Sequence, residues 1–533
     1  MAISSFIKQQ TKDLPVEFEL RPTQGDGFKI VQQGESFKVT GNNERSCLWG
    51  LYHIQAGGNE GTYTPRFQIR GTNPCETLAR HSSEQIESFI DRMAHWWMNT
   101  IIIHICYGYK FHENKIERMC AERGIDIKYY VQTSLMFLSE AQSSVFACDK
   151  NGNPRTKQLE NETRLCVSNP AALEAFRAGA RRFFSSDNVR PGSAYILMDA
   201  DGYLFCQCPK CRNIAPSEQW MRLLNIALEE ADRSGKNLSI EYLSYVWRYK
   251  LPENFSTFDK VSGVMFDTHQ RFRWKALNEP HVITIYSDFE AEVDLRAKGV
   301  PLNCYLYERL KQWRQAYSNK LYIFENLMLQ GSISCPQPYT PQLLTDLDLY
   351  EDLGIDGVIY EAFEPGIESF TRQIGVLSRA MWSEQQSYEP TKLDQLCAGL
   401  SENEADFDFK NRFDVLEYLT TDKFDALAAL RQSGYDSLLC EYAARLRVFL
   451  NDRTFEHFCE VVTFVNQHRK RFDWMYIAFN LARAIPPERK PWNDAAESVR
   501  QFLEVDKIHD LMEQMSEPLE ETARIIDSLI KTD

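Results

Sequence analysis

The sequence predicts an α/β protein built on a (β/α)8 TIM barrel, with a small α+β domain before the barrel and an all-helical domain after it. Eight apolar runs of strand length alternate with helical stretches across residues 66–388. Several runs are apolar throughout, as in strands that are buried on both faces. An open doubly wound sheet is the alternative, but no glycine-rich fingerprint follows any of the runs.

Residues 1–65 are expected to form the small α+β domain. Residues 28–41 alternate between polar and apolar side chains and contain a turn signal at Gln33-Gly34, which predicts a β-hairpin. The next segment, 44–58, has apolar residues at helical spacing and ends in two glycines. A hairpin followed by a helix is therefore expected ahead of the barrel.

The barrel strands follow in order along residues 66–388. They are expected at 67–71, 100–105, 125–132, 194–199, 238–245, 261–267, 321–326 and 357–362. Three of the intervening helices carry end signals: Ser82 or Ser83 as a cap, Gly124 as a stop, and Pro170 in a first turn. Since barrel enzymes place their active sites at the carboxyl ends of the strands, polar residues at those ends are the site candidates.

Beyond residue 389 strand-like runs stop, and amphipathic helical patterns continue to residue 533. This predicts the helical C-terminal domain. Its role in assembly is open, including a homo-oligomer in which a partner subunit completes the site.

Charge and cysteine usage narrow the class of protein. The chain has 75 acidic and 60 basic residues, a net charge of −15, which argues against nucleic acid as a partner. Its 14 cysteines are scattered, as expected of free thiols in a reducing compartment. The first residues lack the apolar core of a signal peptide, and no run reaches membrane-spanning length. A cytoplasmic protein without membrane contact is expected.

Two consecutive motifs are the most distinctive part of the sequence. They are TRLCVSNPAALEAF at 163–176 and ILMDADGYLFCQCPKCR at 196–212. Together with segments 27–55, 307–328 and 346–362, they resemble glycoside-hydrolase-like proteins that carry the domain of unknown function 4838. Those proteins are related to family 20 hexosaminidases and family 67 α-glucuronidases. The resemblance covers most of the first 370 residues.

The resemblance implies a sugar-cleaving barrel that acts on an oligosaccharide or glycan of the N-acetylhexosaminide or uronide class. One position departs from the pattern. Family 20 relatives hold an Asp-Glu pair after the fourth strand, whereas this chain has Asp199-Ala200-Asp201. The glutamic acid of those relatives therefore cannot be carried over to this chain.

Glycoside hydrolysis commonly uses two carboxyl groups that flank the scissile bond. The catalytic candidates are Asp201, Glu325 and Glu361. By resemblance, Asp201 occupies the place of a loop aspartate, and the two glutamates end the seventh and eighth strands, where the relatives hold acidic residues that face the sugar. Asp201 is the expected general acid. The alternative for each carboxylate is a helix cap or an ion pair with arginine.

Other polar and aromatic residues are candidates for binding the substrate. Arg70 is expected to close the first strand and grip a sugar hydroxyl or carboxylate, or else to pair with Glu361. The remaining candidates lie at strand ends or within the distinctive motifs: His104, Asp199, Asn169, Tyr245, Asp267 and Asn326. For the histidine and the tyrosine, a structural role is the alternative.

Cys206, Cys208 and Cys211 have a spacing that allows one Zn²⁺ ion to take three thiolates. A fourth ligand is needed. The resemblance places the motif of Cys166 beside this loop, which makes Cys166 a candidate. Otherwise the thiols are structural, or two of them oxidise. Catalysis itself is expected to need no cofactor.

The sequence thus favours a glycoside hydrolase that works by paired-carboxylate acid/base catalysis on a carbohydrate substrate. A catalytically silent carbohydrate-binding barrel is the alternative, because the departure at Asp199-Ala200-Asp201 falls at a sensitive position.

Overall fold

The computed structural model describes most of the chain up to residue 383. The described ranges are 2–11, 14–74, 83–105, 113–138, 143–155, 164–200, 205–245, 248–252, 255–268, 271, 275–280, 300–329, 332–336, 340–361 and 368–383, with a few helical positions between 441 and 464. The predicted helical domain at 389–533 lies outside the described residues apart from those positions, and the domain boundaries stay a prediction.

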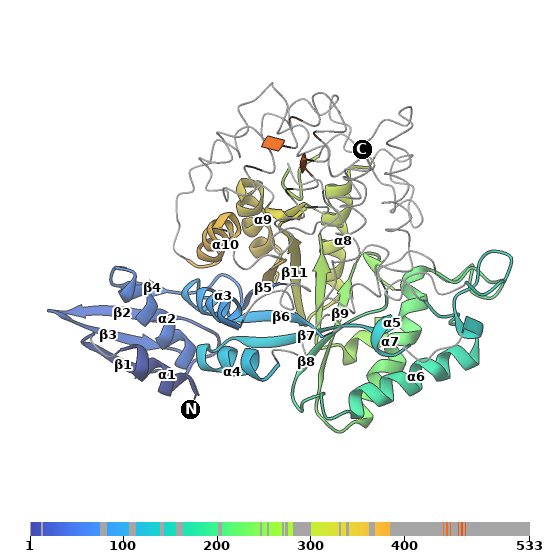
Figure 1. The fold of residues 1–533 in the computed structure, drawn as a ribbon, viewed down its shortest axis with the longest axis horizontal. Coiled ribbons are helices and arrows are strands. Elements are labelled where there is room, and N and C mark those ends of the chain that lie inside the picture. Colours follow the sequence, from blue (N-terminus) through green and yellow to red (C-terminus); the bar gives the residue numbers. More distant parts are fainter. Residues whose placement is uncertain are drawn as a thin grey trace.

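Eight parallel strands close into a barrel, as the sequence predicts (Figure 1). In order around the barrel they are β5 (Ile69–Asn73), β6 (Thr100–His104), β7 (Asp126–Gln132), β8 (Ala194–Met198), β9 (Ser239–Ser244), β10 (Gly263–Asp267), β11 (Lys320–Asn326) and β14 (Gly357–Glu361). A short hairpin, β12 (Met328–Leu329) and β13 (Ser332–Pro336), follows the seventh barrel strand.

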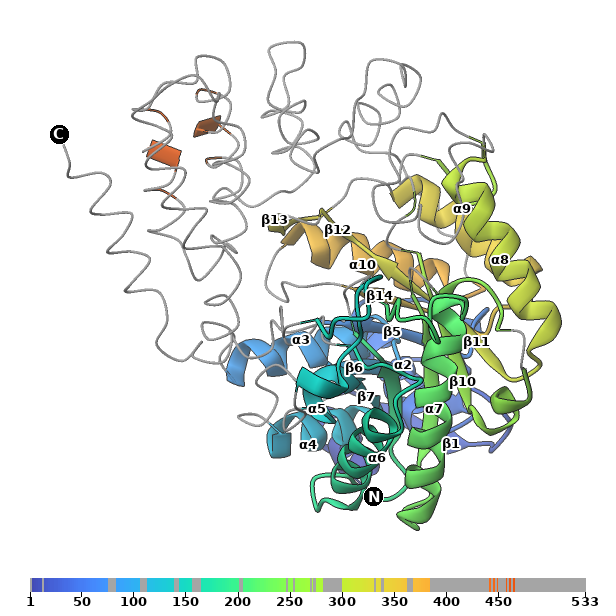
Figure 2. The same ribbon diagram turned by 90° about the vertical axis from the view of Figure 1, so that its right-hand side faces the viewer.

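Helices surround the strands, with α4 and α6 at the bottom of Figure 2 and α9 and α10 towards its top. The helices of this layer are α3 (Ser83–His95), α4 (Glu113–Arg123), α5 (Thr133–Met136), α6 (Pro170–Ser185), α7 (Pro216–Arg233), α8 (Leu302–Ala316), α9 (Thr340–Asp352) and α10 (Glu368–Ala380). Gly124, with φ of +67°, ends α4 as predicted. No helix in the described ranges is both long and apolar enough to cross a membrane.

Alternate residues of each barrel strand face the interior. Ten buried side chains form the interior cluster: Ile69, Ile102, Tyr130, Ile196, Met198, Leu243, Met265, Tyr322, Phe324 and Ile359. Lower in the barrel, Lys128 Nζ lies 2.7 and 2.8 Å from the two carboxylate oxygens of Glu241, and Tyr322 donates to Glu241 Oε2 at 2.6 Å. Glu241 therefore faces the interior of the barrel, where it is paired with Lys128, and does not face the surrounding helices.

A four-stranded sheet lies beside α3 and α4 (Figure 1). Its order is β1 (Val16–Leu20), β3 (Ser36–Gly41), β2 (Phe28–Gln33) and β4 (Gly61–Tyr63). The predicted hairpin is confirmed as β2 and β3, and the predicted helix as α2 (Glu44–Gln55). An additional helix, α1 (Ala2–Gln10), packs against α2 and α4.

A buried ion pair joins this N-terminal unit to the barrel. Arg70 donates to Asp26 Oδ2 at 2.8 Å and to the carbonyl oxygen of Phe67 at 2.6 Å, and Asn99 donates to the same Asp26 oxygen at 2.9 Å. The Arg70 guanidinium also lies 4.7 Å from the ring centroid of Trp382. Burial alone would raise the pKa of Asp26, but Arg70 and a second arginine together lower it to about 2.

This arrangement corrects the expected place of Arg70. The first barrel strand begins at Ile69 and ends at Asn73, so Arg70 lies near its amino end and not at its carboxyl end. Its side chain is fully buried between the barrel and the N-terminal unit. Its ion pair is with Asp26 and not with Glu361.

We predict that Asp26→Ala destabilises the protein by about 3–5 kcal/mol, because the substitution leaves Arg70 buried without its charged partner. Chemical denaturation of the full chain measures the change. Glu19→Ala is the control, since Glu19 pairs with Arg21 at the surface and its loss should matter little. Equal losses in both variants would contradict a special role for the buried pair.

Candidate functional site

The carboxyl ends of the strands bring together a polar layer on the inner side of the barrel. Asn73, His104, Asp267 and Glu361 occupy the inward positions of their strands, and all four are buried. Asn73 and Glu361 are register partners on neighbouring strands. Asn73 was not singled out from the sequence, although its inward position follows once the strand is known to end there.

His104 contacts inward-facing side chains on both neighbouring strands. Its Nε2 lies 3.1 Å from Asn73 Nδ2, and its ring stacks on that of Tyr130 with centroids 4.0 Å apart. Burial lowers the pKa of His104 to about 3. The imidazole is therefore neutral near pH 7, which suits it to hydrogen bonding with a hydroxyl more than to charge pairing.

Asp267 ends β10 and is fully buried, and Tyr249 donates a hydrogen bond to its Oδ2 at 3.3 Å. Tyr245 follows β9 and packs against the interior cluster, with the Arg248 guanidinium 5.7 Å from its ring centroid. Asp267 thus belongs to the inner layer, and Tyr245 borders it from the side of β9.

Two of the predicted residues are incompletely covered by the structure. Asn326 ends β11 and is the register partner of Glu361, but its side chain lies outside the described residues. Asp201 lies outside them altogether. Asp199 and Ala200, which precede it, are described and place the start of its loop at the carboxyl end of β8.

The structure corrects the expectation that Glu325 faces the sugar. Its side chain lies on the outer, helix-facing side of β11. Tyr350 of α9 donates to Glu325 Oε1 at 2.7 Å, and Arg271 Nη1 lies 2.9 Å from the same oxygen. Arg271 Nη1 also lies 2.5 Å from Asp346 Oδ2. The strand alternation that sends Tyr322 and Phe324 inward sends Glu325 away from the interior.

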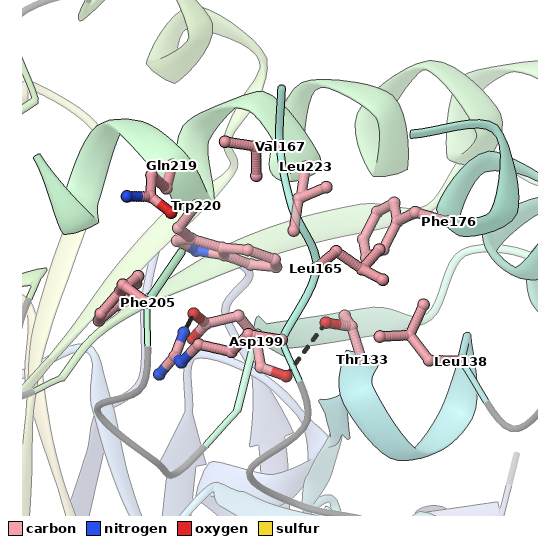
Figure 3. A pocket seen from close by; sticks show the side chains of 11 residues that line it. Thr133, Leu138, Leu165, Val167, Phe176, Asp199, Phe205, Gln219, Trp220 and Leu223 are labelled. Carbon is pink, nitrogen blue, oxygen red and sulfur yellow. Dashed lines mark hydrogen bonds and ion pairs between the residues drawn. The ribbon is translucent and has the colours of Figure 1, made fainter. Parts of the chain in front are cut away.

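Asp199 also faces outward, into a cavity of about 20 Å³ beneath α6 and α7 (Figure 3). Its carboxylate forms ion pairs with Arg164 and Arg248. Phe176 and Trp220 line the same cavity. A space of this volume suffices for about one water molecule. The cavity is too small for a sugar ring, and Asp199 is held there by its two arginines.

Asn169 has a structural role at the start of α6. Its side-chain Oδ1 accepts a hydrogen bond from the backbone N–H of Ala171 at 3.0 Å, as in a helix N-cap. Pro170 occupies the first helical position, as predicted. The amide expected to bind substrate is thus engaged in capping the helix.

Four cysteine thiols converge beside the loop that follows β8. The Sγ atoms of Cys166, Cys206, Cys208 and Cys211 all lie within 4.8 Å of one another. Three of these cysteines were predicted to form the group, with Cys166 as the candidate fourth member. The structure brings Cys166 from the segment before α6 to meet them.

The buried cluster of Arg271, Glu325 and Asp346 predicts a pH dependence of stability. Burial raises the pKa of Asp346 to about 6, with Glu325 adding to the effect and Arg271 opposing it. The folded state therefore retains a proton between about pH 4 and pH 6 that the unfolded chain has lost, and stability falls as pH rises through this window. Wild type should lose roughly 3 kcal/mol relative to Asp346→Asn across it. Denaturant titrations at a series of pH values measure this, and parallel profiles would contradict the shift.

Comparisons with known proteins place the fold. No protein-family model and no curated protein sequence matches the chain, so membership of the family with domain 4838 stays a prediction. The solved structures similar to this chain include three glycosidases.

A family 138 glycoside hydrolase that targets pectin rhamnogalacturonan II has a TM-score of 0.50 and 9% identity, covering 97% of this chain and 79% of its own. The chitobiase of Flavobacterium johnsoniae has a TM-score of 0.48 and 11% identity, covering 99% and 90%. A β-N-acetylhexosaminidase of Bacteroides fragilis has a TM-score of 0.44 and 14% identity, covering 76% and 90%. At 9% identity, the likeness to the family 138 structure shows a shared fold and no more.

Proposed function

We propose that the chain is a glycoside hydrolase that acts on an oligosaccharide or glycan by means of carboxylates at the carboxyl ends of its barrel strands. The observation that carries the proposal is the inner layer formed by Asn73, His104, Asp267 and Glu361. Carboxylates, an amide and a neutral imidazole that face the interior at one end of the barrel are groups that can bind sugar hydroxyls and transfer protons. The fold shared with a family 138 glycoside hydrolase is consistent with this proposal.

Glu361 is the proposed base or nucleophile. It ends β14 on the inner face of the barrel and is 8% exposed, so a small part of its surface remains open to solvent. Asn73 on one neighbouring strand and Asn326 on the other flank it in register. Asp201 remains the proposed general acid, since its loop leaves the carboxyl end of β8.

The charges of the inward-facing side chains help to choose between an N-acetylhexosaminide and a uronide as the substrate. Among the inward-facing side chains that the structure describes at the carboxyl ends, none is a lysine or an arginine. His104 is neutral near pH 7, and Lys128, lower in the barrel, is paired with Glu241. A uronate would need a cation for its carboxylate. We therefore favour an N-acetylhexosaminide over a uronide as the substrate.

A catalytically silent carbohydrate-binding barrel is the second candidate function. It is favoured by the outward positions of Glu325 and Asp199, each held by arginine. These pairs leave fewer carboxylates for chemistry than the sequence suggested. A silent barrel should bind a sugar without turnover, and its affinity should survive Asp201→Asn.

We predict that Glu361→Gln lowers kcat about 10²- to 10⁴-fold on an aryl N-acetylhexosaminide, because the amide cannot act as base or nucleophile. Steady-state kinetics with a panel of aryl N-acetylhexosaminides and glucuronides measures this. Asp201→Asn should cause a loss of similar size.

Glu325→Gln is the matched control, because Glu325 lies near the same end of the neighbouring strand but faces the helices. It should lower stability while leaving the kcat of the folded protein nearly unchanged. Equal kinetic losses in the Glu325 and Glu361 variants would contradict the assignment. Turnover unaffected by Glu361→Gln would refute it, whereas binding without turnover in wild type would select the silent barrel.

A further inference from the structure

We propose that Cys166, Cys206, Cys208 and Cys211 bind one Zn²⁺ ion through four thiolates, and that this ion fixes the loop leaving β8 to the segment before α6. The site is separate from the inner layer of the barrel. Zinc binding by these thiols does not require the protein to be a hydrolase.

The spacing of the sulfur atoms fits a tetrahedral ion. With zinc–sulfur bonds of about 2.3 Å, four thiolates at the corners of a tetrahedron lie roughly 3.8 Å apart. Cys166 Sγ lies 3.8 Å from Cys208 Sγ and 3.9 Å from Cys211 Sγ. All four sulfur atoms lie within 4.8 Å of one another.

The surroundings of the cluster orient its thiols. The backbone N–H of Cys148 donates to Cys206 Sγ at 3.3 Å, and the Cys211 thiol lies 3.0 Å from Ser168 Oγ. Gln219 of α7 is 4% exposed and binds the loop backbone through both ends of its amide. Its Oε1 accepts from the N–H of Cys206 at 3.2 Å, and its Nε2 donates to the Cys206 carbonyl oxygen at 3.2 Å. Hydrogen bonds of this kind hold metal ligands in place.

The cluster joins two parts of the chain that are far apart in sequence. Cys166 lies in the segment before α6, and the other three cysteines lie between β8 and α7. Two residues before Cys166, Arg164 donates to the carbonyl oxygen of Ala200 at 2.9 Å and pairs with Asp199. The segment therefore contacts the loop at its start through Arg164 and beyond Phe205 through the thiols. Arg164 thus holds the start of the stretch that carries Asp201, and a metal ion at the thiols would fix its far side.

Metal analysis of the full-length protein tests the proposal. Protein purified under reducing conditions without chelator should contain one zinc per chain by mass spectrometry. Reconstitution with Co²⁺ should give the visible bands and sulfur-to-metal charge transfer of a tetrahedral thiolate site. Both measurements use wild type, so neither depends on the folding of a variant. Metal-free wild type with reduced thiols, or with a disulfide within the cluster, would overturn the proposal.

Variants assign the ligands. Cys166→Ser and Cys206→Ser should each lose most of the bound zinc. Cys148→Ser is the matched control, since Cys148 contributes its backbone N–H to the cluster and its thiol lies outside the four-sulfur group. Zinc loss in the control equal to that in the ligand variants would refute the assignment.

Hydrogen exchange tests the fixing role. Removing zinc from wild type should speed amide exchange in residues 164–168 and 205–212, while helix α10 serves as an internal reference. Unchanged exchange in those two segments on zinc removal would overturn this part of the proposal. Zinc content is measured without any substrate, so a failure here is distinguishable from an absence of glycosidase activity.

Discussion

The two-residue period of the barrel strands decides which side chains can meet a ligand. In a closed parallel barrel, one side chain points to the interior and the next points to the surrounding helices. Glu325 and Glu361 lie near the carboxyl ends of neighbouring strands, yet the register pairs Glu325 with Tyr360 and Glu361 with Asn326. Only Glu361 shares the interior with His104 and Asn73. Whether a carboxylate at a strand end can meet a ligand therefore depends on which face of the strand it occupies more than on how near the end it lies.

Carboxylates on the outer face need partners of their own. A buried ionised group is costly unless a counter-charge and hydrogen bonds replace water. Glu325 has Arg271 and Tyr350, and Asp199 has Arg164 and Arg248. These arginines reach the strand ends from connecting segments. The carboxylates that face the helices are thus neutralised by arginines of the connecting segments. The side chains that face the interior at the carboxyl ends remain polar.

The sequence was sufficient to predict the strands of the barrel. It was insufficient to predict which side chains of those strands face the interior and which face the helices. All eight strands could be predicted, because buried parallel strands are apolar runs of distinctive length. The same apolarity on both faces removes the contrast that would tell the interior from the exterior, so the outward position of Glu325 could not be predicted. A shift of two residues in the first strand likewise moved Arg70 to the opposite end of the barrel. Asp201 lies outside the described residues, and its role as general acid stays a prediction.

The contact between Asp26 and Arg70 has a consequence for how this architecture can be inherited. The arginine belongs to the first barrel strand and its counter-charge to the sheet that precedes the barrel. Trp382, which follows the last helix of the barrel, packs edge-on against Trp49 of the preceding unit with ring centroids 5.5 Å apart. A recombination that transferred the barrel alone to another gene would leave Arg70 without its counter-charge. It would also expose the indole ring of Trp382 to solvent. The two units are therefore expected to pass through evolution together, as one piece.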